Sequence, residues 1–438
     1  MNFSRIGRRI SERWAEFRGY TPVDRNLFYM CVEIFPAGIA MGMVAFNPPF
    51  VLRLGGSDSL IGWMTSLPAL MAILFSMPAA SFMERRSNRR PAMISNISLA
   101  RVVFLLIALV PWVLPAGWQP FAIVGLVSIQ AIFVAFFNAG WLSLLADVCP
   151  PDRRSTFFSM RWLLLAITWG VSSFLSGLWL DMVPFPLNYQ TLNFAGFVCS
   201  EYSSYIISRA TFPVYAVRQR VATAKSSMRP RIDLRGFKQF VKANLGFVNV
   251  NIAVLITFLG VWGAGPLLTL YFVNTLHVRD SWLGINTLMG QLGTMAGAIL
   301  ANRYIKLKSN SWVMRRALIL FWVYPLIIVL IPIPEVIWIF SFIFLTLDPI
   351  MNVTLLSMLY ELIPENRRSS WMSGHVTLMN IGAMFAPLIT VEIAHLISIN
   401  AALIVCALFR LIGVALFWLL PVLSHKNQPS VPASDQPI

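Results

Sequence analysis

The stretch DVCPPDRRSTFFSMR, residues 147–161, occurs a second time as ELIPENRRSSWMSGH, residues 361–375. The two copies align without a gap, and five of their fifteen positions are identical. A long apolar run precedes each copy and another follows it. An acidic residue, a proline that ends a helix and a pair of arginines between two apolar runs are typical of a short loop at one membrane face. Self-similarity at half the chain length predicts two equivalent helical bundles.

The composition is that of a membrane protein. The chain of 438 residues is 57% hydrophobic and 12% charged, whereas soluble proteins carry about 25% charged residues. A single water-soluble core could not bury this much apolar sequence, but a bilayer takes up about 20 apolar residues in each helical span. We therefore predict an all-α polytopic membrane protein. Its first apolar run is long enough to span and follows a polar, basic start, so we expect no signal peptide.

The basic residues fall almost wholly into alternate loops. Of the 34 lysines and arginines, 28 lie in segments predicted inside, two lie outside (Arg53 and Arg279) and four lie within spans. This asymmetry follows the positive-inside rule and predicts a multi-pass protein of the cytoplasmic (plasma) membrane, with both termini in the cytoplasm. The net charge of +16 then indicates attraction to anionic lipids of the inner surface, not to nucleic acid.

Twelve transmembrane helices are predicted, in two pseudo-symmetric six-helix bundles at 26–214 and 245–421. The spans run near 26–52, 59–83, 92–114, 119–146, 157–181, 190–214, 245–275, 280–302, 314–333, 335–360, 375–397 and 399–421. A second repeat supports the two halves, because DSLIG at 58–62 opens span 2 and DSWLG at 280–284 opens span 8. An aspartate before an apolar run is a helix N-cap, so both spans are expected to begin alike.

The remaining segments are polar. Residues 1–25 include an amphipathic stretch that predicts a helix lying on the inner membrane surface. Residues 215–244 carry eight basic residues against the single acid Asp233 and form the predicted cytoplasmic linker between the halves. The tail at 422–438 is rich in proline and serine, which is typical of a disordered cytoplasmic tail.

The loop after span 2 completes a resemblance. It reads ASFMERRSNRR at 80–90, and together with the two six-helix halves and the repeated arginine loops it resembles the major facilitator superfamily (MFS). The resemblance covers residues 20–422 and implies the MFS fold. It also implies that Glu84 is a charge-relay latch, near Arg153 or Arg154, that holds the inner gate closed in the outward-facing state. The loop after span 8 keeps its bases but has no carboxylate, so this latch is expected in the first half only.

The same resemblance suggests which residues work at the inner gate. All are charged or titratable, and they flank the loops after spans 2, 4 and 10. These gating candidates are Glu84, Arg85, Arg89, Arg90, Asp147, Arg153, Arg154, Arg161, Glu361, Arg367, Arg368 and His375.

Ionisable side chains within spans are costly and require an explanation. Glu33 in span 1 either lines the central cavity or belongs to a structural network; Asn251 is its equivalent in the second half. Asp348 in span 10 stands where the first half has Val134, so symmetric packing does not explain it. Asp348 either handles protons or pairs with Arg410 in span 12. Neutral candidates for the substrate cavity are Asn138 and Asn352.

These features favour a secondary transporter that moves a small organic solute by alternating access. A carboxyl group that is removed from water binds a proton more readily, so we expect proton coupling through Glu33 or Asp348. The many Met, Phe and Trp residues favour export of an amphipathic compound. The alternatives are a facilitator or Na⁺-coupled importer of a metabolite, and a non-transporting sensor or scaffold on the same fold. No enzyme motif or metal-ligand spacing occurs in the sequence, so we expect no catalytic residue, metal or cofactor, and a monomer.

Overall fold

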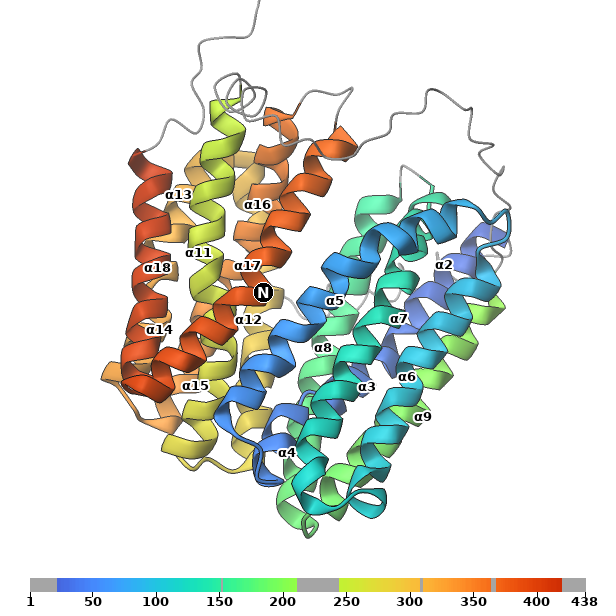
Figure 1. The fold of residues 1–438 in the computed structure, drawn as a ribbon. Helices are drawn as coiled ribbons and strands as arrows, with labels where there is room; N and C mark the ends of the chain where they lie inside the picture. The colour runs from blue at the N-terminus through green and yellow to red at the C-terminus, as the bar shows by residue number, and fades with distance from the viewer. Residues whose placement is uncertain (1–21, 151–152, 211–243, 308–309, 364–367, 420–438) are drawn as a thin grey trace, which may run out of the picture.

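The computed structural model describes residues 22–150, 153–210, 244–307, 310–363 and 368–419, and these residues form helices and short connections without any strand. Figure 1 shows two helical bundles standing side by side, one blue to green and one yellow to red. The predicted surface segment at 1–21, nearly all of the linker at 215–244 and the tail at 422–438 lie outside the described residues.

The first bundle contains the helices of the N-terminal half. These are α2 (Pro22–Val32), α3 (Ile34–Val44), α4 (Asn47–Arg53), α5 (Asp58–Glu84), α6 (Arg90–Val113), α7 (Gln119–Val148), α8 (Arg154–Met182) and α9 (Leu187–Arg209). The second bundle contains α11 (Leu245–Leu270), a π-helical turn (Tyr271–Thr275), α12 (Asp280–Leu307), α13 (Asn310–Phe321), α14 (Val323–Leu330), α15 (Pro334–Leu345), α16 (Leu347–Leu362), α17 (Arg368–Leu396) and α18 (Ile399–Leu419). The predicted all-α fold is confirmed.

Eleven helical segments of the described chain are long and apolar enough to cross a membrane. The twelfth predicted span corresponds to α9, which has 23 residues but many polar side chains. Because α9 packs against α3 and α6 along the first bundle, it completes the six-helix set of that half.

Prolines divide three of the spans. A proline has no N–H for the carbonyl four residues earlier, and its ring clashes with that carbonyl. In each case a helix ends at the residue four before the proline: α2 ends before Pro36, α13 before Pro325 and α15 before Pro349. The breaks fall at Glu33, Trp322 and Thr346. Two of them therefore lie beside a carboxylate that the sequence singles out, since Asp348 follows Thr346 by two residues.

The two halves contact each other through α8 against α12 and through α5 against α17. Glycines bring the backbones of α8 and α12 together. A Cβ atom at Gly177 would lie 2.5 Å from the carbonyl oxygen of Asp280, and one at Gly284 would lie 2.5 Å from that of Ser173. Small residues are the usual means of close helix contact in a membrane.

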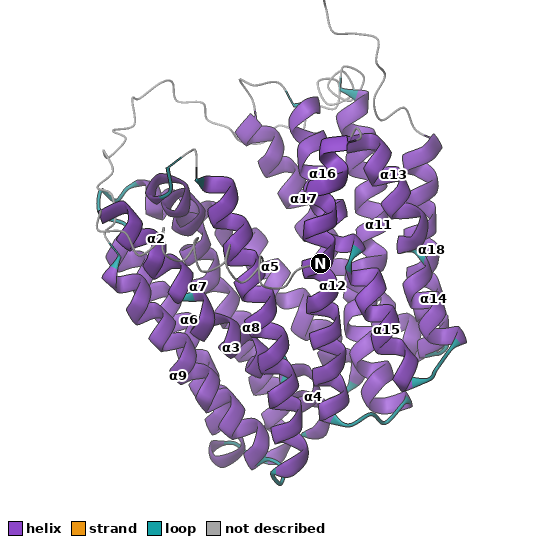
Figure 2. Cartoon of the chain, turned by 180° about the vertical axis from the view of Figure 1, so that it is seen from behind, coloured by secondary structure: helices purple, strands orange, loops and turns teal. Residues whose placement is uncertain are grey.

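The bundles meet at one end and diverge at the other (Figure 1), and the view from behind in Figure 2 agrees. We call the diverging end, where α5 ends and α6 begins, the basic end because its connections carry the paired arginines, such as Arg85 and Arg86. We call the other the opposite end. It holds the connections at 54–57 and 276–279.

The close contact between α8 and α12 leads to a prediction about stability. Gly284→Ala should lower the thermal unfolding temperature of the purified protein by several degrees, because a methyl group cannot fit against the Ser173 carbonyl oxygen. Gly265→Ala is the matched control, because a Cβ there meets no atom within 4 Å. It should leave stability unchanged or raise it slightly, through the better helix propensity of alanine. Equal effects of the two changes would contradict the predicted role of Gly284.

Candidate functional site

Glu33 lies in a polar network inside the N-terminal half. It occupies the break between α2 and α3, where its side chain is 3% exposed. One carboxylate oxygen lies 2.7 Å from an Arg161 nitrogen of α8, and the other accepts a hydrogen bond of 2.8 Å from Ser203 of α9. Arg101 of α6 donates to Ser203 and Ser204. The network therefore joins α3, α6, α8 and α9, and both oxygens of Glu33 are engaged within it.

A neutral pair occupies the equivalent place in the C-terminal half. Asn251 of α11 and His375 of α17 are the repeat equivalents of Glu33 and Arg161. The Asn251 side-chain oxygen lies 2.7 Å from Nδ1 of His375. In each half a side-chain contact at this repeat position thus joins the first helix to the fifth, and it is ionic in one half and neutral in the other. Sequence reasoning found all four residues but did not pair them.

Asp348 lies in the first turn of α16, directly after the break at Thr346. Its half-buried side chain accepts a hydrogen bond of 3.0 Å from Asn352, one turn further along the same helix. Both residues were predicted, and the structure brings them together. The position suits a carboxylate, because the N-terminus of a helix is the positive end of its dipole.

Arg410 does not form the predicted alternative pair with Asp348 in the described part of the chain. Its Nε donates to the Gly260 carbonyl oxygen at 3.2 Å, and one terminal nitrogen donates to the Phe321 carbonyl oxygen at 3.3 Å. The guanidinium also lies 4.9 Å from the centre of the Phe321 ring. The Phe321 carbonyl is available because Pro325, four residues later, has no N–H to donate. Arg410 is thus satisfied without Asp348.

The described gating candidates at the basic end make contacts with several helices. Glu84 is exposed, and its carboxylate is not within ion-pair distance of Arg153, which instead lies 2.7 Å from Asp24 at the start of α2. Arg90 donates to the backbone oxygen of Ser208. Glu84 is therefore not paired with Arg153 here, and the side chain of Arg154, the other partner that the resemblance implies, lies outside the described residues.

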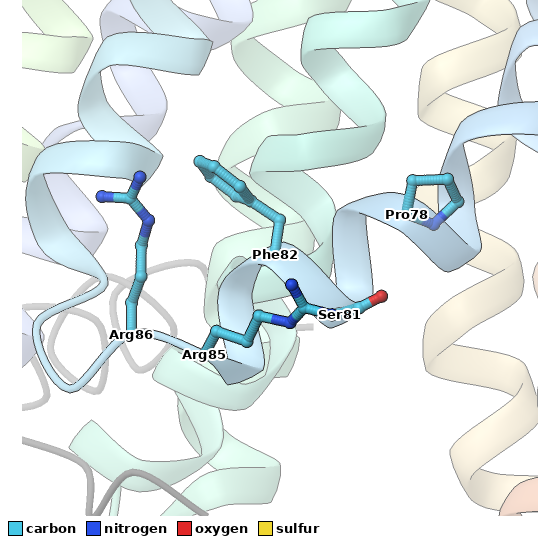
Figure 3. A pocket seen from close by; sticks show the side chains of 5 residues that line it. All are labelled: Pro78, Ser81, Phe82, Arg85 and Arg86. Atoms are coloured by element: carbon cyan, nitrogen blue, oxygen red, sulfur yellow. The ribbon is translucent and has the colours of Figure 1, made fainter.

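Arg85 and Arg86 line an open pocket of about 440 Å³ at the end of α5. Figure 3 shows Arg86 beside Phe82, Arg85 below it with its guanidinium near Ser81, and Pro78 further along the helix. The Arg86 guanidinium stacks 4.3 Å from the centre of the Phe82 ring. Because the pocket is built from one helix end alone, it is a surface feature of the basic end and not a site between the halves.

For the remaining candidate residues the structure gives mainly their exposure. Asn138 and Glu361 are exposed, and Arg89 is half-buried. Arg367 and the side chains of Asp147, Arg154 and Arg368 lie outside the described residues.

Sequence reasoning missed a cluster at the opposite end that joins the two halves. Asp280, at the start of α12, is paired with Arg53 at the end of α4, with 2.8 Å between nitrogen and oxygen. Tyr189 of α9 donates to the same carboxylate. The repeat at 58–62 and 280–284 was the available signal, but it suggested only helix caps. The Asp280 side chain instead reaches across to the other half.

Solved structures with the same architecture are transporters. A bacterial homologue of the human lysosomal transporter Spinster, in an inward-facing and unoccupied conformation, is 13% identical with a TM-score of 0.67, over 92% of this chain and 97% of that one. A variant of the nucleoside transporter NupG is 10% identical with a TM-score of 0.68 (90% and 98%), and a D-xylose–proton symporter is 12% identical with a TM-score of 0.65 (90% and 98%). At these identities the likeness shows the fold alone.

The sequence itself identifies the family. No curated protein matches the chain, but the family model of the Major Facilitator Superfamily matches residues 30–231 and 250–437, which together cover most of both halves. The resemblance inferred from the loop motifs is therefore confirmed: this chain belongs to the Major Facilitator Superfamily of membrane transporters.

Proposed function

We propose that the protein is a proton-coupled secondary transporter that moves a small organic solute across the cytoplasmic membrane by alternating access. The observation that carries this proposal is Asp348, a half-buried carboxylate at a helix break within a membrane span. Within the described chain it is bonded to Asn352 alone and to no base. A carboxylate in that setting is stabilised by a positively charged partner that binds reversibly. A proton or a cationic group of the solute can be that partner.

The arrangement of the halves supports alternating access. The hydrogen bonds and the ion pair that cross between described residues of the two halves lie at the opposite end. The bundles diverge toward the basic end (Figure 1). This arrangement supports a state open toward the basic end, and rocking of the halves about the α8–α12 contact would give the alternative state.

Proton coupling follows from the chemistry of Asp348. Removal from water disfavours the charged form of a carboxyl group, while the Asn352 amide and the start of α16 favour it. A change in hydration as the halves rock would shift this balance, and the carboxyl group would then bind or release a proton. The Glu33 carboxylate is less suited to this work because Arg161 and Ser203 already hold both of its oxygens.

The direction and the class of solute rest on composition. The chain contains 32 Phe, 20 Met and 15 Trp residues, and the described mid-span carboxylates are few, which favours export of an amphipathic compound. A thermal-shift screen of the purified protein against sugars, amino acids, organic anions and amphipathic drugs would identify the solute. Stabilisation by a sugar or an amino acid alone would contradict the amphipathic class.

The central prediction concerns the Asp348→Asn variant. Its transport of the solute identified in the screen is measured in liposomes. Because Asn mimics the protonated acid, accumulation driven by a pH gradient should fall at least tenfold, while solute exchange without a gradient continues. Glu335→Gln is the matched control, because Glu335 is an exposed carboxylate at the opposite end and its side chain has no partner in the described chain. It should transport as the parent does.

Two outcomes would overturn the coupling assignment. Parent protein whose uptake ignores an imposed pH gradient would be a facilitator, or a Na⁺-coupled importer if a sodium gradient drives uptake. Full recovery of transport in the double variant Asp348→Asn with Arg410→Gln would show that Asp348 only neutralises Arg410.

Absence of transport for every ligand that stabilises the protein would favour a sensor or scaffold.

A further prediction concerns topology. Because the basic end should face the cytoplasm, reporter fusions after Arg90, Arg154, Lys225, Lys308 and Arg368 should read as cytoplasmic. Fusions near Gly117, Pro186, Arg279 and Pro334 should read as external. A single firm reversal would contradict the proposed orientation or the number of spans.

A further inference from the structure

Two contacts between the halves at the opposite end are related by the internal repeat. Asp58 and Asp280 begin the equivalent helices α5 and α12, and each has a polar residue shortly before it, Arg53 before Asp58 and Asn274 before Asp280. Asp280 pairs with Arg53 of the first half. Asp58 accepts a hydrogen bond of 3.1 Å from Asn274 of the second half. The same contact is thus made twice, but only the Asp280 contact is an ion pair.

The Asp280 carboxylate is held from several sides. Arg53 of α4 lies 2.8 Å away, and the Tyr189 hydroxyl of α9 lies 3.0 Å from each carboxylate oxygen. The Tyr189 ring is itself fixed, because it stacks on Phe50 with 4.8 Å between the ring centres. All of these partners belong to the N-terminal half, so the carboxylate of the C-terminal half is bound by the other bundle.

A second aspartate anchors the backbone of the same turn. Asp181, at the end of α8, accepts hydrogen bonds of 3.1 Å and 3.3 Å from the backbone N–H groups of Asp280 and Ser281. It thereby supplies the cap that the sequence suggested Asp280 itself would supply. The charged and titratable groups that face the Asp280 side chain are therefore Arg53 from α4, Tyr189 from α9 and Asp181 from α8.

The two partners of the ion pair differ in their access to water. The Arg53 side chain is 38% exposed, whereas that of Asp280 is 2% exposed. If the halves separate while Asp280 is charged, the pair is lost, and Asp280 needs water before it can leave its site. If Asp280 is first protonated, the attraction to Arg53 is removed. Arg53, already partly exposed, can then be hydrated, and the closed end loses its ion pair while the neutral acid still accepts from Tyr189.

We propose that Asp280 is a proton-binding site that operates the opening of the opposite end. Its charged form holds α12 to α4 and α9 and keeps this end closed, and binding of a proton from the solution on that side releases it. The inference rests on the proposed function, in which a proton gradient drives the cycle. It adds a proton site to that function, because Asp348 lies at mid-span and Asp280 lies between the halves at the end of the span.

Pulsed EPR on the purified protein in lipid nanodiscs tests the proposal without any solute. Spin labels are placed at Gly117→Cys and Ile397→Cys, which are exposed connections of the two halves at the opposite end, in a chain whose four native cysteines are replaced. At pH 8 the short inter-label distance of the closed end should dominate. At pH 5 a longer distance should become at least tenfold more populated.

Matched variants separate the ion pair from general effects of charge. Asp280→Asn and Arg53→Gln should show the long distance at both pH values. Arg279→Gln removes a neighbouring exposed arginine whose side chain has no partner in the described chain, so it should respond to pH as the parent does. Asp58→Asn should also keep the pH response, because the Asp58 contact with Asn274 contains no base.

The proposal is overturned if the pH-dependent distance change survives in Asp280→Asn, or if Arg53→Gln stays closed at both pH values. Arg53 is partly exposed, so its variant remains informative even where Asp280→Asn does not fold. Failure of the proposed function would give a different result. Uptake would then be independent of the pH gradient, while the distance change would still depend on Asp280. The protein would be gated by pH but not driven by protons. If the parent shows no pH-dependent distance change but still accumulates solute in an Asp348-dependent way, only the inference about Asp280 is contradicted.

Discussion

The cost of an unpaired polar group in an apolar environment governs this structure. Within the described helices, the buried charges are held by short contacts to other helices: Glu33 by Arg161, Arg410 by two backbone carbonyls, and Asp280 by Arg53. Each contact ties one helix to another, so the groups that are most expensive to bury also set the helix positions. Removal of one partner from a buried ion pair such as Glu33 with Arg161 costs about 3–5 kcal/mol.

Proline residues determine where several of the polar groups lie. The breaks before Pro36 and Pro349 place Glu33 and Asp348 at points where the helical hydrogen-bond ladder is interrupted. The break before Pro325 leaves a carbonyl that Arg410 uses. Backbone irregularity and buried charge therefore occur together, because a broken turn offers the free donors, acceptors and dipole ends that a charge requires. A continuous helix at the same positions would present only side chains.

The helices themselves were predictable, and the reason is physical. Apolar run length and the arginine pattern report directly on the bilayer, so the observed helix ends lie close to the predicted spans, and the repeat at 147–161 and 361–375 predicted the two halves. The pairing of side chains was less accessible. Glu33, Arg161, Asn251 and His375 were all singled out, but their contacts depend on helix rotation, which run length does not report. The direction of Asp280 was missed for the same reason, since its position suggested a local cap while its partner is 227 residues away in Arg53.

The internal symmetry holds for the backbone and fails for the charges. Toward the basic end, the ionic pair of Glu33 with Arg161 corresponds to the neutral pair of Asn251 with His375 in the other half. At the opposite end, the ionic pair of Asp280 corresponds to the neutral contact of Asp58 with Asn274. A fully symmetric transporter would give its two halves equal responses to protons and no reason for one end to open before the other. An ionic contact binds strongly when charged and weakly when neutralised, whereas an amide contact changes little. Glu33 shares this asymmetry, but both of its oxygens are already held by Arg161 and Ser203. Under the proposed coupling, Asp348 at mid-span and Asp280 at the closed end are therefore the carboxylates through which protons would act.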